Sequence, residues 1–393
     1  MKNFILIFVC LFIFSRQAFA KDSKINTPEV NAHGAVLMDF KTGRVLWGKN
    51  HKTPLAMAST TKIMTAIVAI ENTNLDDMVK VSKKASMSPE VKMYLTENEE
   101  IKLEYLLYAL MMQSYNDSAV AIAEHISGSV EEFCVFMTEK AKELGAMDTV
   151  FETPSGLDLG EHHSTAYDMA LITRYALKND KFLEIINTPH ITVLSNKTTY
   201  NLVNKNRLLN EFEGANGVKT GFTGKAGHCL VGSAKRDDMQ LISVVLASGW
   251  GNMGKEQKWI DTKKILDYGF SAYEYHDIID MGKVAGSINI DRSRTSKIEL
   301  MYSEDFFLPL TKEELEKLDI ESYYPESLKA PVNKGDTLGS VRVFIDGCVV
   351  KEIDLVATDS AKRHDLKTSL EKVLSNWISM GTNEEINLVL PEF

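Results

Sequence analysis

The first regular pattern along the chain is a pair of short apolar runs joined by a turn. Gly34 to Phe40 is almost continuously apolar, which is typical of a buried strand, and Arg44 to Trp47 has the pattern of its partner. Thr42-Gly43 lies between the two runs, where a hairpin turn belongs. We therefore predict a β-hairpin at the start of the fold.

A helical period follows the hairpin. Apolar side chains recur at the spacing of one buried helix face, at Ile63, Ala66, Ile67 and Ile70. This pattern places Ser59 near the N-terminus of a buried helix.

The middle of the chain keeps the helical period, and strands return after it. Further helices are predicted at Leu103 to Met112, Ser118 to Ile126, Val130 to Leu144 and Ala166 to Leu177, with a turn at Pro154-Ser155-Gly156. Later strands and a closing helix are predicted at Gly214 to Thr220, His228 to Ala234, Gln240 to Ala247 and Gly254 to Tyr268. A sheet that begins early, is interrupted by helices and is completed late indicates the α+β class.

The pattern changes near His276, where short strands and turns replace the long helices. Strands are predicted at Ser287 to Ile290, Lys297 to Tyr302, Thr337 to Phe344 and Val349 to Leu355. Thr311 with Glu314 has the spacing of a capping box, which predicts a short helix between them. We therefore expect one domain over 21–275 and a smaller β-rich domain over 276–360.

Both ends of the chain have patterns of their own. Residues 1–20 combine Lys2, an apolar run from Ile5 to Phe14 and the small residues of Ala18-Phe19-Ala20, the layout of a secretory signal peptide. An uncleaved N-terminal anchor is the alternative. Within the terminal segment 361–393, one face of Leu366 to Ile378 is apolar. That face could bind a membrane surface or pack on protein, and the extra residues from Gly381 to Phe393 weaken the membrane interpretation.

Composition and charge narrow the class of protein. The 393 residues are 44% hydrophobic and 25% charged, as in a globular protein with a core, and the length favours two domains. The formal charge is −10, and it becomes −12 when Lys2 and Arg16 leave with the leader. An acidic chain without a basic block disfavours a nucleic-acid partner.

The cysteines suggest neither a disulfide framework nor a metal site. Cys134, Cys229 and Cys348 remain after the leader, an odd number at wide spacing. No pair has the spacing of zinc ligands, and the histidines lack a pattern such as His-Glu-x-x-His. We expect the three cysteines to be buried small hydrophobes and expect no metal or other cofactor.

One short motif carries nucleophile chemistry. Ser-x-x-Lys places a hydroxyl and an amine one helical turn apart, and the lysine can take the serine proton if its pKa is lowered. The motif occurs at Ser59/Lys62 and again at Ser369/Lys372, where a solvated helix face explains it. The motif alone therefore does not select a nucleophile.

Two other motifs are also duplicated, and their order resolves the ambiguity. Ser-x-Asn occurs at Ser114/Asn116 and Ser287/Asn289, and Lys-Thr-Gly at Lys41 to Gly43 and Lys219 to Gly221. Ser59/Lys62 at a helix start, Ser114/Asn116 between helices and Lys219-Thr220-Gly221 on a strand resemble, in this order, the site of penicillin-binding proteins and serine β-lactamases.

Longer stretches resemble the low-molecular-mass D-alanyl-D-alanine carboxypeptidases, which are penicillin-binding proteins. They are Met57 to Thr65, Ser114 to Ser118, Pro154 to Asp158 and Gly217 to Thr223. The likeness runs from about Ala35 to Phe270 and continues more weakly through Ala330-Pro331-Val332 and Gly335-Asp336-Thr337. It implies a transpeptidase-like domain, with an antiparallel sheet and a helical insertion, followed by the β-rich domain. The terminal helix also resembles the membrane anchor of that family.

The resemblance implies a role for each matching residue. Ser59 would attack the D-alanyl-D-alanine bond of a peptidoglycan stem peptide, with Lys62 as general base and Ser114 as proton relay. The substrate would be held by Asn116, Lys219, Thr220, Gly221 and Phe222, and the backbone N–H groups of Ser59 and Phe222 would form the oxyanion hole. β-Lactams would be covalent inhibitors. The enzyme would act outside the cytoplasm, at the outer face of the membrane, in the cell wall or in the periplasm.

One departure and two rival functions remain. Many relatives carry an arginine after the last sheet strand, near the substrate carboxylate, whereas this chain reads Gly254-Lys255-Glu256, with Lys255 as a candidate substitute. A β-lactamase is the nearest rival, but Tyr115 replaces the aspartate of its Ser-Asp-Asn motif and Glu152 lacks the expected context. A catalytically silent wall-binding protein is the rival from another class.

Overall fold

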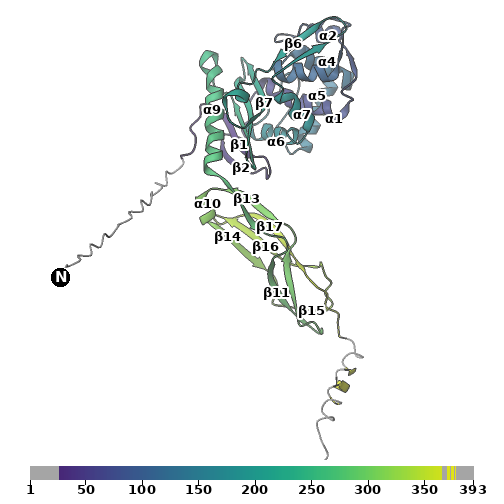
Figure 1. Cartoon of the computed structure of the whole chain (residues 1–393), viewed down its shortest axis with the longest axis vertical. Coiled ribbons are helices and arrows are strands. Elements are labelled where there is room, and N and C mark those ends of the chain that lie inside the picture. The colour runs from purple at the N-terminus through teal and green to yellow at the C-terminus, as the bar shows by residue number, and fades with distance from the viewer. Residues whose placement is uncertain (1–25, 365–369, 372, 376, 378–393) are drawn as a thin grey trace, which may run out of the picture.

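The computed structural model of the chain describes residues 26–364, 370–371, 373–375 and 377. Two bodies lie end to end along the long axis, a larger one of mixed helices and strands and a smaller β-rich one (Figure 1). The predicted α+β class is confirmed, since a sheet begun by the first strands is completed after a long helical block.

An antiparallel sheet with the order β2-β1-β9-β8-β7 forms the centre of the larger body. Its strands are β1 (Gly34–Asp39), β2 (Val45–Lys49), β7 (Ala215–Thr223), β8 (Gly227–Arg236) and β9 (Met239–Leu246). Each was predicted within a few residues of its bounds. Within this sheet β7 pairs only with β8, so its other edge can accept an extended peptide.

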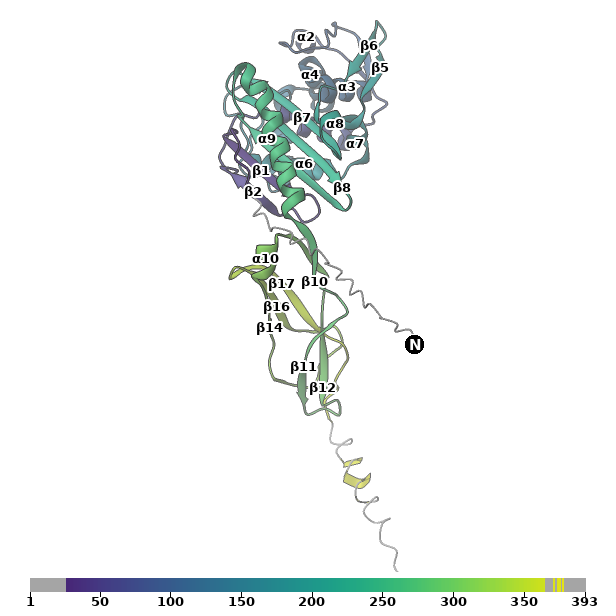
Figure 2. The same ribbon diagram turned by 60° about the vertical axis from the view of Figure 1, so that its left-hand side comes forward.

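Both faces of the sheet are covered by helices, which explains the nearly unbroken apolar sequence of β1. Val36 and Met38 pack with the helical block, whereas Ala35 and Leu37 pack with α9 (Gly251–Ala272). Figure 2 shows α9 running across its face of the sheet. A strand buried on both faces loses the alternation that marks a half-buried one.

The helical block lies against the opposite face. Its main members are η1 (Ala58–Thr61), α1 (Lys62–Asn72), α3 (Leu103–Tyr108), η2 (Ala109–Gln113), α4 (Asn116–Ser127), α5 (Val130–Glu143) and α6 (Ala166–Ala176). The helix predicted from Leu103 passes into the π-helical turn η2 and ends at Ser114, which has a left-handed backbone with φ +68°.

Several small elements of the larger body were not predicted. They are α2 (Lys83–Ser86), α7 (Asp180–Asn187), α8 (Leu208–Glu211), β3 (Met78–Lys80), β4 (Glu100–Lys102), β5 (His190–Leu194) and β6 (Thr199–Val203). Most have three to five residues, too few for a period of 3.6 or 2 to stand out in the sequence.

The β-rich body contains a sheet with the order β14-β16-β17-β12-β11-β15 and a separate pair, β10-β13. Its elements are β10 (Glu274–Ile279), β11 (Val284–Asp291), β12 (Lys297–Tyr302), β13 (Phe306–Leu310), α10 (Lys312–Glu316), β14 (Leu318–Tyr323), β15 (Ser327–Lys329), β16 (Thr337–Ile345) and β17 (Cys348–Ala357). The capping box of Thr311 and Glu314 is confirmed at the start of α10.

Polar contacts join the two bodies. Arg44, beside the first hairpin, forms an ion pair with Glu314 at 2.5 Å, and the Tyr275 hydroxyl donates to Asp39 Oδ1 at 2.5 Å.

Cys134 and Cys229 are buried as expected, but the expectation was wrong for Cys348, which begins β17 after a turn and is exposed.

The ends of the chain are described only in part. The leader at 1–20 lies outside the described residues, as does most of the segment from 365 onward. Four described members of its predicted apolar face are exposed, namely Leu370, Val373, Leu374 and Trp377. Among the described residues, no helix combines the length and the apolar character needed to cross a bilayer.

Candidate active site

Ser59 and Lys62 meet where η1 runs into α1. Lys62 is fully buried, and its Nζ donates to Ser59 Oγ at 3.0 Å. The residue before the serine, Ala58, has a left-handed backbone with φ +50°, a conformation that costs a non-glycine residue free energy. The surrounding fold therefore holds the serine in one orientation, facing the lysine.

The surroundings of Lys62 favour its neutral form. Burial is the main cause that lowers the pKa of Lys62 well below its usual range, the charge of Lys219 adds to it, and Asp117 opposes both. Lys62 Nζ also donates to Asn116 Oδ1 at 2.8 Å and to the Ser155 carbonyl at 2.5 Å. When the amine is neutral, its two hydrogens go to Asn116 Oδ1 and the Ser155 carbonyl, so its lone pair faces Ser59 Oγ and can accept the Ser59 proton.

Asn116 and Asp117 fix the start of α4 beside the lysine. The Asn116 amide donates to the carbonyls of Pro89 (3.2 Å) and Glu90 (3.1 Å), which orients its oxygen toward Lys62. Asp117 is fully buried and accepts hydrogen bonds from the backbone N–H groups of Met93, Leu95 and Ser118. No sequence pattern assigned a role to Asp117, because Met93 and Leu95 lie in a loop that is 24 and 22 residues away along the chain.

Two glycines allow backbone segments to reach the nucleophile. A Cβ at Gly156 would lie 2.0 Å from the Ala58 carbonyl oxygen, and one at Gly221 would lie 3.0 Å from Ser59 N. The Pro154-Ser155-Gly156 turn and β7 thus close on η1 from two sides. Any side chain at Gly156 would displace the turn whose Ser155 carbonyl holds Lys62.

The Lys-Thr-Gly segment of β7 supplies the second lysine of the site. Lys219 is 2% exposed, and its Nζ donates to the Thr220 carbonyl at 3.1 Å. Burial, followed by the charges of Lys205 and Lys258, lowers the pKa of Lys219 to about 7. Phe222 is exposed, and its ring stacks on His228 with centroids 4.3 Å apart.

Ser114 is less closely connected than its neighbours. It occupies the left-handed position between η2 and α4, next to Asn116. Within the described part of the chain, no hydrogen bond joins its hydroxyl to Lys62 or Ser59. The structure thus brings Ser59, Lys62 and Asn116 into direct contact and leaves Ser114 at the rim.

The duplicate motifs lie elsewhere. Lys41 to Gly43 forms the hairpin turn, where the Thr42 hydroxyl donates to Asp39 Oδ2 at 2.6 Å. Ser287 and Asn289 lie on β11 of the β-rich body. Ser369 and Lys372 fall outside the described residues.

His162 supports η1 and had no signal in the sequence. Its Nδ1 accepts from Glu152 N at 3.0 Å, so in the neutral ring Nε2 carries the proton and donates to Thr61 Oγ1 at 2.9 Å. Burial is the main cause that lowers the pKa of His162 to about 4. A neutral His162 therefore anchors Thr61, the residue directly before Lys62.

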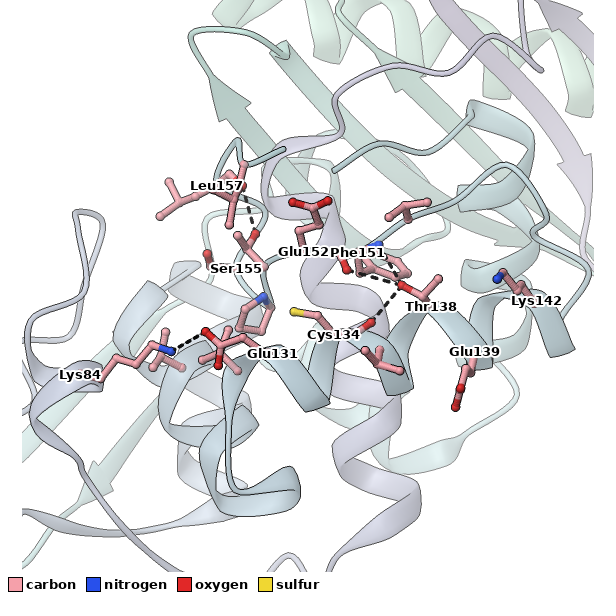
Figure 3. Close-up of a pocket in the computed structure, with 17 residues that line it drawn as sticks. Lys84, Glu131, Cys134, Thr138, Glu139, Lys142, Phe151, Glu152, Ser155 and Leu157 are labelled. Carbon is pink, nitrogen blue, oxygen red and sulfur yellow. Dashed lines mark hydrogen bonds and ion pairs between the residues drawn. The ribbon is translucent and has the colours of Figure 1, made fainter. Parts of the chain in front are cut away.

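A hollow of about 680 Å³ lies behind the turn, between α5 and residues 150–159 (Figure 3). Cys134 and Thr138 project from α5, and Ser155 and Leu157 lie on the opposite wall. Ser59, Lys62 and Lys219 do not line this hollow. A separate observation concerns metals: among the described residues, no three or more His, Cys, Asp or Glu side chains lie together so that they could hold a metal ion.

Two family models and several curated proteins match the sequence of this chain. Residues 21–249 match the family model described as D-alanyl-D-alanine carboxypeptidase, and residues 273–363 match that of the penicillin-binding protein 5 C-terminal domain. The chain is 35% identical over 383 residues to D-alanyl-D-alanine carboxypeptidase DacF of Bacillus subtilis, covering 95% of this chain and 97% of the relative. It is 31% identical to DacC of Escherichia coli, covering 90% of each.

Solved structures share the fold. The D-alanyl-D-alanine carboxypeptidase DacD of Francisella tularensis superposes with a TM-score of 0.72 at 27% identity, covering 90% of this chain and all of the other. Penicillin-binding protein 5 of Haemophilus influenzae has the same TM-score at 29% identity, covering 86% and 99%.

Proposed function

The chain belongs to the D-alanyl-D-alanine carboxypeptidase family, and from this premise we propose that Ser59 is the nucleophile that cleaves the terminal D-alanine from peptidoglycan stem peptides. Its activity is that of a serine-type carboxypeptidase. The observation that carries the residue assignment is the contact of Ser59 Oγ with a fully buried lysine at 3.0 Å.

Acylation begins with the transfer of the Ser59 proton to Lys62. The neutral amine takes the proton while Ser59 Oγ attacks the carbonyl carbon of the penultimate residue. The N–H groups of Ser59 and Phe222 stabilise the resulting oxyanion, where loss of one donor typically costs about 2.7–4 kcal/mol. Ser114, at the rim of the site, relays a proton to the leaving D-alanine amine.

The substrate lies along the free edge of β7. Main-chain hydrogen bonds to an edge strand orient an extended peptide, which suits the stem peptide of the wall. Thr220 and Lys219 face its terminal carboxylate, and Asn116 holds Lys62 while facing the peptide backbone. Water then releases the acyl group, and β-lactams are trapped at the same serine.

Release of D-alanine from a pentapeptide ending in D-alanyl-D-alanine tests the proposal. We expect one D-alanine and one tetrapeptide per turnover, and no release by Ser59→Ala. A wild-type protein that binds the peptide without releasing D-alanine would instead be a silent wall-binding protein.

The β-lactamase alternative has weaker support from the site. The Glu152 side chain is engaged in its own loop, where Oε1 accepts from Glu161 N at 3.1 Å. With nitrocefin we expect a single burst of product, equal to the amount of enzyme, followed by slow turnover. Rapid continuous hydrolysis would favour a β-lactamase.

We also propose that the protein is exported through a leader that is cleaved off, and that its C-terminal segment contacts a membrane surface. The leader pattern predicts a mature chain beginning at Lys21, with a catalytic domain at 21–275 and a β-rich domain at 276–360. The exposed Leu370, Val373, Leu374 and Trp377 support contact of segment 361–393 with a membrane surface. N-terminal sequencing tests the first point, and membrane fractionation of a chain truncated after residue 364 tests the second.

A further inference from the structure

Asp261 is a buried carboxylate that the proposed mechanism does not use. It projects from α9 and is fully buried. Its oxygens accept hydrogen bonds from Asn31 N (3.2 Å), Ala32 N (3.0 Å), the Ser248 hydroxyl (2.5 Å) and the Gln257 amide (2.8 Å). None of these four donors is a cation. Burying a carboxylate without a cation costs free energy, so such a group is retained where the segments that it joins must stay in place.

The hydroxyl that Asp261 binds belongs to a corner, residues 247–249, at the end of β9. Ala247 has a left-handed backbone with φ +52°, which costs a non-glycine residue free energy. Ser248 follows it and is 1% exposed. Asn31 and Ala32 lie on the segment that leads into β1, so the same carboxylate also ties the corner to the start of the fold. Asp261 therefore holds a strained corner in place from two sides.

This corner pairs with His228 of β8. Ser248 N donates to the His228 carbonyl at 2.8 Å, and His228 N donates to the Gly249 carbonyl at 2.9 Å. Both backbone polar groups of His228 thus point toward the corner and away from β7. Directly opposed residues of an antiparallel pair either bond to each other or both turn their polar groups outward.

Phe222 is the residue of β7 that lies opposite His228. Because His228 turns its polar groups toward the corner, the N–H and C=O of Phe222 point to the free edge of β7, where an oxyanion donor is needed. Phe222 packs on His228 instead of bonding to it, and the two rings stack with centroids 4.3 Å apart. The position of this N–H therefore follows the position of His228, which follows the corner.

A second contact joins the corner to the turn between β7 and β8. Trp250, directly after the corner, donates its Nε1–H to the Gly224 carbonyl at 3.0 Å. A Cβ on Gly227 would lie 3.0 Å from both Trp250 Cε2 and Gly249 O. The turn that follows Phe222 is thus packed on the same backbone segment that Asp261 fixes.

We propose that Asp261 is a positioning residue for the oxyanion hole, and that it places the Phe222 N–H through Ser248 and His228. This inference rests on the proposed carboxypeptidase function and adds to it a residue that touches neither the substrate nor Ser59. A displaced donor stabilises the oxyanion of the transition state less and changes the binding of the ground-state peptide little. A defect at Asp261 should therefore appear in kcat and not in KM.

Asp261→Asn keeps the size of the side chain but removes its charge and one acceptor oxygen. With a pentapeptide ending in D-alanyl-D-alanine, we expect kcat to fall about 10- to 100-fold, less than the 10²–10³-fold typical for complete loss of one donor, and KM to change less than about threefold. Ser248→Ala removes one of the four hydrogen bonds and should lower kcat about 3- to 10-fold. A rise in KM with kcat unchanged in Asp261→Asn would contradict the proposal.

Asp168 of α6 offers a matched control. It is 2% exposed, and its carboxylate accepts from Asp148 N and from the Thr149 hydroxyl, each at 2.8 Å. Asp168→Asn should lower the melting temperature, as Asp261→Asn does, but leave kcat per folded molecule within about twofold of the wild type. Equal falls in kcat in the two variants would reduce Asp261 to a structural role and overturn the proposal.

The infrared spectrum of the acyl-enzyme reports on the oxyanion hole directly. Benzylpenicillin labelled with ¹³C at the β-lactam carbonyl forms an ester with Ser59, and hydrogen bonds to the carbonyl oxygen of this ester lower its stretching frequency. We expect the ester band of Asp261→Asn and of Ser248→Ala at a higher wavenumber than in the wild type, and that of Asp168→Asn unchanged. An unchanged band in both Asp261→Asn and Ser248→Ala would overturn the proposal.

The carboxypeptidase proposal and the role of Asp261 fail in different ways. A wild type that forms the penicillin ester but releases no D-alanine would overturn the carboxypeptidase proposal, while the ester band would still test Asp261. Normal release by the wild type, with kcat of Asp261→Asn within about threefold of it, would overturn only the role of Asp261. If Asp261→Asn does not fold, Ser248→Ala decides the question, because it removes a single hydrogen bond.

Discussion

The two bodies of the molecule bury different kinds of side chain. In the described residues, every buried polar or charged side chain lies between Asp39 and Thr262, within the larger body. The β-rich body buries an apolar core, which includes Ile298, Val341 and Leu355. Burying a polar group costs free energy unless it finds a partner, so such groups persist where chemistry or geometry requires them.

This difference shows that the larger body holds the buried charged groups, whose burial costs free energy of folding and serves the site. Lys62, Lys219 and Lys258 are buried lysines within one body, and burial lowers the pKa of each. Groups with strongly shifted pKa values gather at functional sites. The buried core of the β-rich body is apolar, so substitutions in that core should lower the stability of the body without changing the rate of the reaction.

The largest effect is expected for Ser59→Ala. D-Alanine release should fall by at least about 10⁴-fold, because the covalent route is lost and only binding and electrostatic contributions remain. The melting temperature should change little, since Ser59 is half-buried and its hydroxyl has one described partner. Ser369→Ala, which alters the duplicate motif, should retain full activity; the reverse result would move the nucleophile to the terminal segment.

Lys62→Met should come next. We expect acylation to slow by about 10²–10⁴-fold, the range for loss of a positioned general base. The variant should also lose stability, because Asn116 Oδ1 and the Ser155 carbonyl lose the same donor. Single-turnover acylation by a fluorescent penicillin measures the rate. A loss smaller than tenfold would remove Lys62 from the role of base.

A smaller change is expected in the pH profile of Lys219→Gln. The charge of Lys219 is the second cause that lowers the pKa of Lys62, after burial. Removing that charge makes the protonated Lys62 less unfavourable, so the acidic limb of the kcat/KM profile should move to higher pH. Lys225→Gln, six residues farther along the chain, serves as the control and should leave the limb in place. A shift to lower pH in Lys219→Gln would contradict the electrostatic assignment.

The smallest effect on activity is expected in the β-rich body. Leu355→Ala removes a fully buried side chain and should destabilise that body by about 2–5 kcal/mol. The rate per folded molecule should match the wild type. Calorimetry and active-site titration with penicillin measure the two quantities, and a change in turnover would show that the bodies are coupled, for example through Arg44 and Glu314.

The sequence predicted the elements that carry a strong local pattern, such as a helical period or a capping box. The apolar spacing from Ile63 to Ile70 indicated α1, and the Thr311/Glu314 box indicated α10. The hairpin β5–β6 was missed because its strands have five residues each and a largely exposed surface. Its position depends on contacts with η2 and other distant elements, which no local pattern encodes.

The same distinction applies to the site. Motif order selected Ser59 over Ser369 and Lys219 over Lys41, because the order reflects which segments can meet. His162 carried no motif, since its importance comes from a partner, Thr61, about a hundred residues away. Lys255 was chosen by its place in the sequence, and the structure leaves its side chain exposed.

The most direct test of the account is the location of the penicillin adduct. The wild-type protein is incubated with benzylpenicillin, digested and mapped by mass spectrometry. We expect one adduct per chain, on Ser59 within the peptide that contains Ser59-Thr60-Thr61-Lys62. An adduct on Ser114, on Ser369 or on any other residue would contradict the claim that Ser59 is the nucleophile.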